Sequence, residues 1–185
     1  MKWLLLALLV VVLLVVVVLV VGWMLPVAHV ASRSASLNAP PEAVWRMITD
    51  IDAFPSWRDG VRNVERLPDR NGYPVWVEDG TTGRITLAVE RSEPPHTLVT
   101  RIADPDLPFG GTWTYTITPT SNGCTLTITE NGEIYNPVFR AMARFVFGYE
   151  STLASYLEGL KKAEGRSQKA EGRSQKAEGG LQKAK

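Results

Sequence analysis

Apolar residues recur at helical spacing through residues 136–162, near the end of the chain. At about 100° per residue they fall on one stripe, whose members are Val138, Met142, Phe145, Tyr149, Leu153, Tyr156 and Leu160. Asn136 can cap the first turn, and Pro137 suits the first helical position because its missing N–H is not needed there. The pattern predicts one long amphipathic helix whose apolar face, including Phe145, is buried.

Short runs of strand-like sequence fill residues 61–133. Six of these runs are bounded by Pro, Gly, Asn and Asp, and Asp79-Gly80 and Asn122-Gly123 are the strongest hairpin signals. The segment therefore predicts six antiparallel strands.

A weaker strand and two short helices are predicted before these six strands. Residues 29–37 alternate weakly between apolar and polar positions, whereas residues 42–49 and 53–57 favour short helices. The apolar stripe of the last helix needs an equally long partner, and outside the N-terminus only the strands provide one. We therefore predict an α+β fold in which a curved antiparallel sheet of about seven strands wraps around the long C-terminal helix.

The N-terminus carries an unbroken apolar run over residues 4–21, bracketed by Trp3 and Trp23. At about 1.5 Å per residue this run matches the thickness of a bilayer core. We predict a single transmembrane helix, with residues 1–27 as a membrane anchor. A cleaved signal peptide is the alternative, but such peptides use apolar runs of only about 7 to 15 residues.

The orientation of this anchor rests on few charges. Lys2 and the amino terminus favour a cytoplasmic N-terminus, which would place the domain outside the cytoplasm, whereas Arg33 and Arg46 on the other side oppose it. We expect a single-pass membrane protein with an extracytoplasmic domain and leave the opposite orientation open.

After the anchor the chain divides into a folded domain, residues 28–162, and a low-complexity tail, residues 163–185. The tail repeats the heptad KAEGRSQ, but each repeat contains a glycine and only alanine recurs as an apolar residue. A coiled-coil seam is therefore not expected. We predict a disordered tail or a fraying extension of the preceding helix.

Charge and reactive residues exclude several classes of function. Twenty basic and nineteen acidic residues give a net charge of +1, which provides no basic field for nucleic acid. His29, His96 and the single Cys124 show no metal-ligand spacing, so we expect no metal. No phosphate-binding glycine loop and no nucleophilic triad is visible, and no cofactor is expected.

The segment NAPPEAVWRMITDIDAFPSW, residues 38–57, has a rigid start at Pro40 and Pro41 and ends in a cluster of aromatic residues. It resembles the opening N-x-P-x-x-V-[WF]…D…[FYW]-P-x-W segment of the START-like superfamily, also called SRPBCC or the polyketide cyclase/dehydrase and lipid-transport group. The resemblance covers residues 31–161 and implies a helix-grip fold with a cavity that commonly takes apolar ligands. It implies no single activity, because members range from lipid carriers to cyclases.

Candidate ligand-binding residues are those that the strand and helix periods place toward the interior. They are Trp57, Trp76, Glu78, Arg101, Trp113, Tyr115, Ile128, Glu130, Met142, Phe145 and Tyr149. Trp57 is either a structural lid or part of a cavity mouth. The inward direction of Trp76 and Glu78 stays open, because the neighbouring valines compete for that side.

Glu130 stands at the end of an apolar strand face. Its carboxylate is expected either at a cavity mouth in water or buried against a donor, for which Arg101 and Tyr115 are candidates.

Three functions are compatible with these residues. The preferred one is a membrane-tethered module that binds a lipid or another apolar small molecule in an internal cavity. The second is a cyclase- or dehydrase-type enzyme that uses Glu130, Glu78, Arg101 or a tyrosine as general acid or base. The third is a structural or interaction role without a ligand. We assign no catalytic residue.

Overall fold

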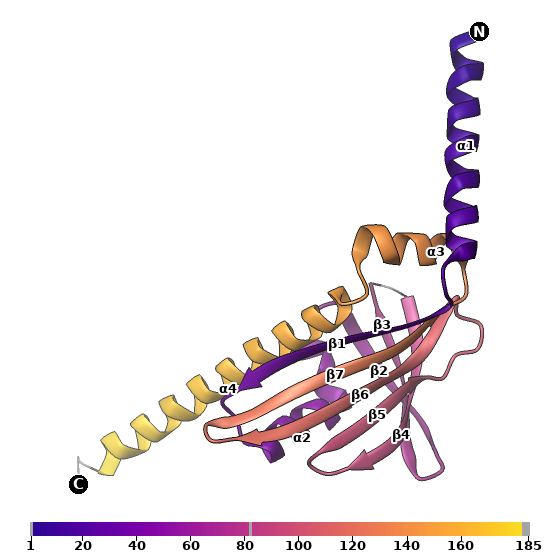
Figure 1. The fold of residues 1–185 in the computed structure, drawn as a ribbon. Coiled ribbons are helices and arrows are strands. Elements are labelled where there is room, and N and C mark those ends of the chain that lie inside the picture. The colour runs from indigo at the N-terminus through magenta and orange to yellow at the C-terminus, as the bar shows by residue number, and fades with distance from the viewer. Residues whose placement is uncertain (1, 82, 183–185) are drawn as a thin grey trace.

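The computed structural model describes residues 2–81 and 83–182, with side chains described as far as Lys169. It contains a seven-stranded sheet, a long C-terminal helix and an N-terminal helix that projects away from the sheet (Figure 1). The strands are β1 (Ala28–Leu37), β2 (Val61–Arg70), β3 (Tyr73–Gly80), β4 (Gly83–Glu93), β5 (Thr97–Ile102), β6 (Phe109–Thr120) and β7 (Gly123–Ile134). The predicted α+β fold is confirmed.

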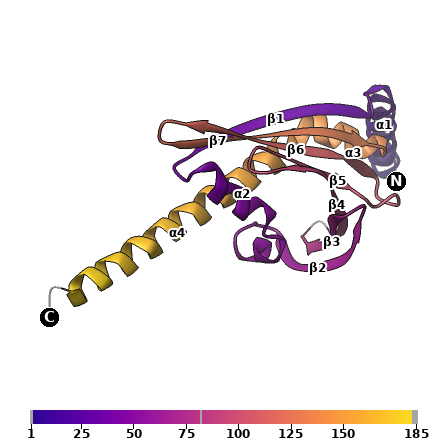
Figure 2. The same cartoon turned by 90° about the horizontal axis from the view of Figure 1, so that it is seen from below.

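All strand pairs are antiparallel, in the order β1-β7-β6-β5-β4-β3-β2. The six later strands form a meander, and β1 joins the sheet beside the last strand, where Leu37 lies opposite Cys124. Seen from below, the sheet curls from β1 round to β2 (Figure 2). A curved sheet of this kind leaves a concave face that a helix can cover.

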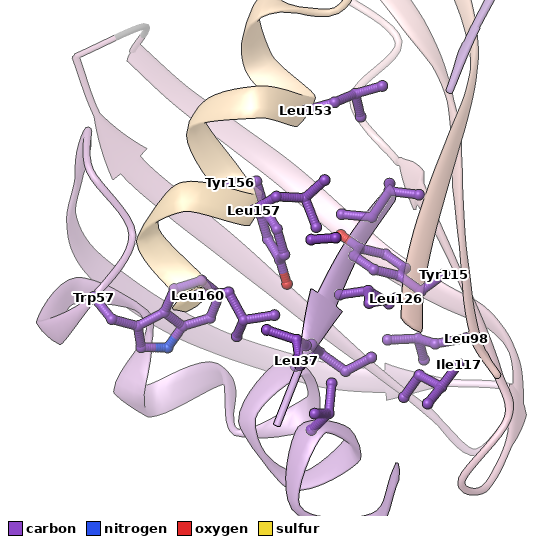
Figure 3. Close-up of a cluster of buried hydrophobic side chains, with 14 of the residues drawn as sticks. Leu37, Trp57, Leu98, Tyr115, Ile117, Leu126, Leu153, Tyr156, Leu157 and Leu160 are labelled. Carbon is purple, nitrogen blue, oxygen red and sulfur yellow. The ribbon is translucent and has the colours of Figure 1, made fainter. Parts of the chain in front are cut away.

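Helix α4 (Ser151–Gln182) supplies the helical side of the core. Its Leu153, Tyr156, Leu157 and Leu160 are buried and point toward strand residues such as Tyr115 and Leu98 (Figure 3). Burying such side chains contributes about 1.5–3 kcal/mol each. The C-terminal part of the predicted stripe is therefore the core face.

Two short helices, α2 (Pro41–Thr49) and the 3-10 helix η1 (Ile51–Ser56), close one end of this core. Just after η1, the buried ring of Trp57 meets Tyr156 edge-on at a centroid distance of 5.2 Å. At Gly159 a Cβ atom would lie 2.7 Å from the Trp57 carbonyl oxygen, so α4 approaches this corner through a residue without a side chain.

The prediction of one continuous helix over residues 136–162 is wrong. The segment contains α3 (Pro137–Met142), a π-helical turn η2 (Ala143–Phe147) and the start of α4. Gly148 separates η2 from α4 with φ +73°, a left-handed conformation that ends a helix and that glycine adopts without a Cβ penalty. Because the axis changes there, Phe145 is 68% exposed instead of buried.

Helix α4 also extends beyond the predicted end of the folded domain. The boundary at residue 162 falls inside α4, which continues to Gln182. Glu164 is buried and accepts a hydrogen bond of 2.7 Å from the Ala39 backbone N–H. The assignment of residues 163–185 to a separate tail stays a prediction, as does the boundary at residue 27.

Helix α1 (Lys2–Met24) is long and apolar enough to cross a membrane. Its C-terminal end packs against α3, and at Gly22 a Cβ atom would lie 1.9 Å from the Pro137 carbonyl oxygen. The buried Arg140 side chain donates a 2.9 Å hydrogen bond to the Leu25 carbonyl, just after α1 ends. The end of α1 is thus held against α3 by close packing and by this hydrogen bond.

Candidate functional site

A cavity of about 350 Å³ lies on the concave face of the sheet. Its walls come from strands β2 to β7, from α2 and η1 with the loop that follows η1, and from Thr152 in the first turn of α4. Most of the strand side chains in this wall are apolar, and they include Ile85, Leu87, Leu98, Ile102 and Trp113. Trp113 also packs edge-on against Tyr156 of α4, with ring centroids 5.7 Å apart, so the cavity lies beside the contact between helix and sheet.

One buried ion pair stands in this apolar wall. The Arg58 guanidinium donates to a carboxylate oxygen of Glu78, and the Trp76 indole N–H donates to the same oxygen at 3.0 Å. The Arg58 guanidinium also lies over the rings of Phe54 and Tyr156, at 4.9 and 5.0 Å from their centroids. The two charges compensate each other, as buried charges must.

The pKa values of Arg58, Tyr115 and Tyr156 are all raised in this cluster. Burial disfavours the charged form of Arg58, but the Glu78 carboxylate together with Tyr156 and Tyr115 outweighs this and raises the pKa of Arg58 above its ordinary value. Burial raises the pKa of Tyr115 to about 12 and that of Tyr156 well above its ordinary value. At neutral pH the cluster therefore contains one cation and two neutral phenols.

A second cavity of about 440 Å³ lies between the sheet and the α3–η2 segment. It shares Ile102, Phe109, Glu130 and Thr152 with the first cavity, so the two spaces adjoin. On the helical side its wall contains Phe139, Met142, Phe147 and Tyr149.

Glu130 stands where the two cavities meet. Its carboxylate oxygen lies 3.3 Å from Nε2 of His29, and the His29 ring stacks on Tyr149 with centroids 4.1 Å apart. Burial raises the pKa of Glu130, although the neighbouring imidazole acts in the opposite direction. The partner of this carboxylate is thus His29, whereas the two predicted donors lie elsewhere: Arg101 pairs with Glu90, and Tyr115 packs on Tyr156.

The predicted binding residues are distributed over both cavities and the core. The first cavity is lined by Trp76, Glu78, Trp113, Tyr115 and Glu130. Met142 and Tyr149 line the second cavity. Trp57 and Ile128 are buried in the hydrophobic core, where Trp57 packs against α4 as a structural lid would.

Arg101 and Phe145 border neither cavity. Arg101 is exposed and pairs with Glu90, because it is one residue out of phase with the inward-facing Thr100 and Ile102. Phe145 lies in η2 and is exposed, because the axis changes at Gly148 between η2 and α4. We do not retain either residue as a candidate ligand contact.

The sequence analysis missed Arg58 and His29 as site residues. Arg58 lies in the loop after η1, where no period indicates a direction, and its partner is 20 residues away. His29 lies at the start of β1, 101 residues from Glu130. The position of His29 in an edge strand was a usable signal, because pairing of the first strand with the last would have brought it to Glu130.

Comparison with known proteins identifies the family. The sequence profile described as "Polyketide cyclase / dehydrase and lipid transport" matches residues 28–172. The chain belongs to this family. Its START-like domain begins with β1 and, by this match, reaches into the repeats of α4. Among curated protein sequences, none matches the chain significantly.

Solved structures of the START-like fold resemble this domain at low sequence identity. The di-domain aromatase/cyclase StfQ of the steffimycin pathway has a TM-score of 0.61 at 16% identity, over 76% of this chain and 52% of its own, so this START-like chain spans about half of StfQ. The ZhuI aromatase/cyclase of Streptomyces sp. R1128 has a TM-score of 0.61 at 13% identity, and the match covers 75% of this chain and 94% of ZhuI. A norcoclaurine synthase of Thalictrum flavum has a TM-score of 0.62 at 11% sequence identity, and the match covers 78% of this chain and 99% of the synthase. These identities support a shared fold.

Within residues 2–81 and 83–182, no group of three or more His, Cys, Asp or Glu side chains is placed to hold a metal ion.

Glu130→Gln is expected to remove a pH-dependent contribution to stability. The folded-state pKa of Glu130 is raised, so its contribution is fully present below the ordinary value of 4.5 and is lost as the pH rises through the raised value. Glutamine does not ionise and can keep the contact with His29. The variant should therefore gain stability relative to the parent chain as the pH rises above the ordinary value of 4.5. Thermal unfolding of both proteins over this range checks it, and parallel curves would contradict it.

Proposed function

We propose that this chain is a membrane-anchored START-like protein whose domain holds an apolar small molecule, with lipids as the preferred class. The observation that carries the proposal is the cavity of about 350 Å³ on the concave face of the sheet, whose strand walls are largely apolar. Cavities of about 300–1,000 Å³ with mostly apolar walls and a few polar groups are typical of small-molecule sites.

The Arg58–Glu78 pair gives such a ligand an orientation. The cavity wall includes the guanidinium, the carboxylate and Tyr115, whereas Ile85 and Leu87 belong to its apolar part. A molecule with an apolar body and one polar end satisfies both regions, since a polar group placed against Ile85 and Leu87 would lack a partner there. Fatty acids and related lipids have this form.

Helix α1 supplies a reason for this ligand class. An apolar helix of 23 residues in front of the domain would keep the cavity beside a bilayer, which is the reservoir of such molecules. The family description, which includes lipid transport, agrees with this proposal.

A second candidate is an enzyme of the cyclase or dehydrase type. It is favoured by Glu130, a carboxyl group with a raised pKa that borders both cavities and contacts His29. Carboxyl groups of this kind serve as general acids or bases in enzymes. Mass spectrometry of molecules extracted from the purified protein separates the two candidates, because a carrier releases its ligand unchanged and an enzyme converts an added substrate.

A large side chain in the first cavity should weaken the binding of apolar molecules without unfolding the domain. Thr100 is 5% exposed and lines the first cavity, so the side chain of a Thr100→Trp variant should occupy the ligand's space. Thr116→Trp makes the same substitution at an exposed position of the same sheet. We expect Thr100→Trp to weaken the binding of an environment-sensitive apolar dye at least about tenfold and Thr116→Trp to leave it unchanged. Dye titration with fatty-acid displacement measures this, and equal affinities of both variants and the parent would rule out this cavity as the site.

A further inference from the structure

The α3–η2 segment exposes several large apolar side chains together. Phe145, Val146 and Phe147 are consecutive residues with exposed fractions of 68%, 69% and 60%, and Phe139 is 46% exposed. Soluble domains rarely present contiguous apolar groups of this size without a partner. Arg144, in the same turn, is also exposed. Aromatic residues interspersed with a basic residue are typical of segments that lie in a membrane interface.

The position of this segment relative to α1 indicates its partner. Gly22, near the end of α1, packs on Pro137 at the start of α3, and Arg140 of α3 binds the Leu25 carbonyl. In Figure 1, α3 runs crosswise to α1 at the end where α1 meets the domain. If α1 crosses a bilayer, α3 and η2 must lie along the surface of that bilayer. Trp23, which is 78% exposed, stands at the same end of α1.

The backbone explains why these side chains face away from the sheet. The π-helical turn η2 ends at Gly148, whose N–H bonds the Ala143 carbonyl at 2.9 Å and whose φ is +73°. This break lets α4 cover the concave face of the sheet while α3 and η2 follow another direction. A continuous helix would instead have kept Phe145 on the face shared with Leu153.

The second cavity lies directly behind this exposed surface. Phe139 and Phe147 line the cavity and are at the same time 46% and 60% exposed, so they separate it from the outside. On its inner side the cavity reaches Glu130, which also borders the first cavity. The second cavity therefore lies between the exposed phenylalanines and the first cavity.

We propose that α3 and η2 lie in the headgroup region of the bilayer that α1 crosses, and that the second cavity is the portal through which the acyl chain of a bilayer lipid reaches the domain. The portal rests on the proposed function, because it presupposes that α1 is a membrane anchor and that the first cavity binds apolar molecules. The occupant of the exposed surface is the bilayer itself, since Gly22 and Leu25 attach the segment to the membrane end of α1.

The depth of η2 can be measured with the full-length chain in phosphatidylcholine vesicles. Phe145→Cys carries an environment-sensitive label, Glu158→Cys on the exposed side of α4 is the matched control, and the unsubstituted chain with its buried Cys124 gives the background. We expect a lipid-borne nitroxide to quench the label at position 145 at least about twofold more than the control, and aqueous iodide to quench it less. Equal iodide quenching at both positions in chains that float with the vesicles would overturn the interfacial position. Chains that do not float would overturn the anchor and the inference together.

The portal is tested by the rate of lipid uptake. The double variant Phe145→Ser/Val146→Ser changes only exposed side chains, so its thermal stability should match that of the parent. We expect transfer of a pyrene-labelled fatty acid from vesicles to slow at least about fivefold, with an unchanged equilibrium affinity for the apolar dye. Unchanged transfer with normal affinity would refute the portal and leave the carrier function standing, whereas absence of binding by the parent chain would refute the carrier function itself.

Discussion

Arg58→Met is expected to destabilise the domain by about 3–5 kcal/mol. The substitution leaves the Glu78 carboxylate buried, with the Trp76 indole N–H as its remaining donor in the hydrogen-bonded cluster, and an uncompensated buried charge is costly. It also removes the cation over the rings of Phe54 and Tyr156. Urea unfolding of the detergent-solubilised chain, followed by tryptophan fluorescence, measures the change in the free energy of unfolding.

Two further variants show whether the buried charge is the cause. Arg58→Met combined with Glu78→Gln should regain part of the loss, because no unpaired carboxylate then remains in the core. Arg84→Met removes one partner of the exposed Arg84–Glu65 pair and should cost less than about 1 kcal/mol. If Arg58→Met and Arg84→Met unfold at the same urea concentration, the Arg58–Glu78 pair does not stabilise the domain. The proposal that this pair orients a ligand would then lack support.

The strands were predictable because one side of the sheet is buried. In β6, Tyr115 and Ile117 are buried while Thr116 and Thr118 are exposed, so the alternation in the sequence reproduces the two faces directly. In β3 the prediction stayed open, because Val75 and Val77 are buried as well as Trp76 and Glu78. A strand buried on both faces has no polar side to fix its phase.

The prediction of one continuous helix was wrong at Gly148 for a different reason. The apolar stripe continues through this residue, and its spacing alone gives no sign that two helices share it. The glycine itself was a signal, since a left-handed residue commonly ends a helix. Whether glycine is a cap or an interior residue depends on tertiary contacts, here the packing of α3 on α1 and of α4 on the sheet.

The site required contacts that no local pattern contains. Glu130 was recognised from strand phase, and Glu78 was a candidate whose direction stayed open, but their partners His29 and Arg58 come from an edge strand and a loop. Long-range pairs of this kind follow from the order of strands in the sheet. Five strand residues of the first cavity were predicted from the sequence, namely Trp76, Glu78, Trp113, Tyr115 and Glu130, but its apolar β4 and β5 residues such as Leu87 and Leu98 were not, and neither were the charge partners.

The double variant Leu9→Asp/Leu13→Asp, which places two aspartates in α1, is expected to release the full-length chain from membranes. The apolar side chains of α1 are exposed in the structure, and at about 0.3 to 0.6 kcal/mol each their insertion into a bilayer is favourable by on the order of 5 to 10 kcal/mol. Each aspartate near the helix centre costs about 2.5–3.5 kcal/mol, so two of them offset most of this gain.

Carbonate washing of membranes measures the effect of these aspartates. The parent chain should remain in the pellet and the variant should move largely to the supernatant, while Ser155→Asp, on an exposed position of α4, should behave as the parent. The N-terminal sequence of the pelleted protein distinguishes an anchor from a signal peptide, since an anchor retains Lys2 and a cleaved signal does not. Recovery of the parent chain in the supernatant with residues 2–24 intact would show that α1 does not anchor the domain. The apolar α3–η2 surface would then need a partner other than the bilayer.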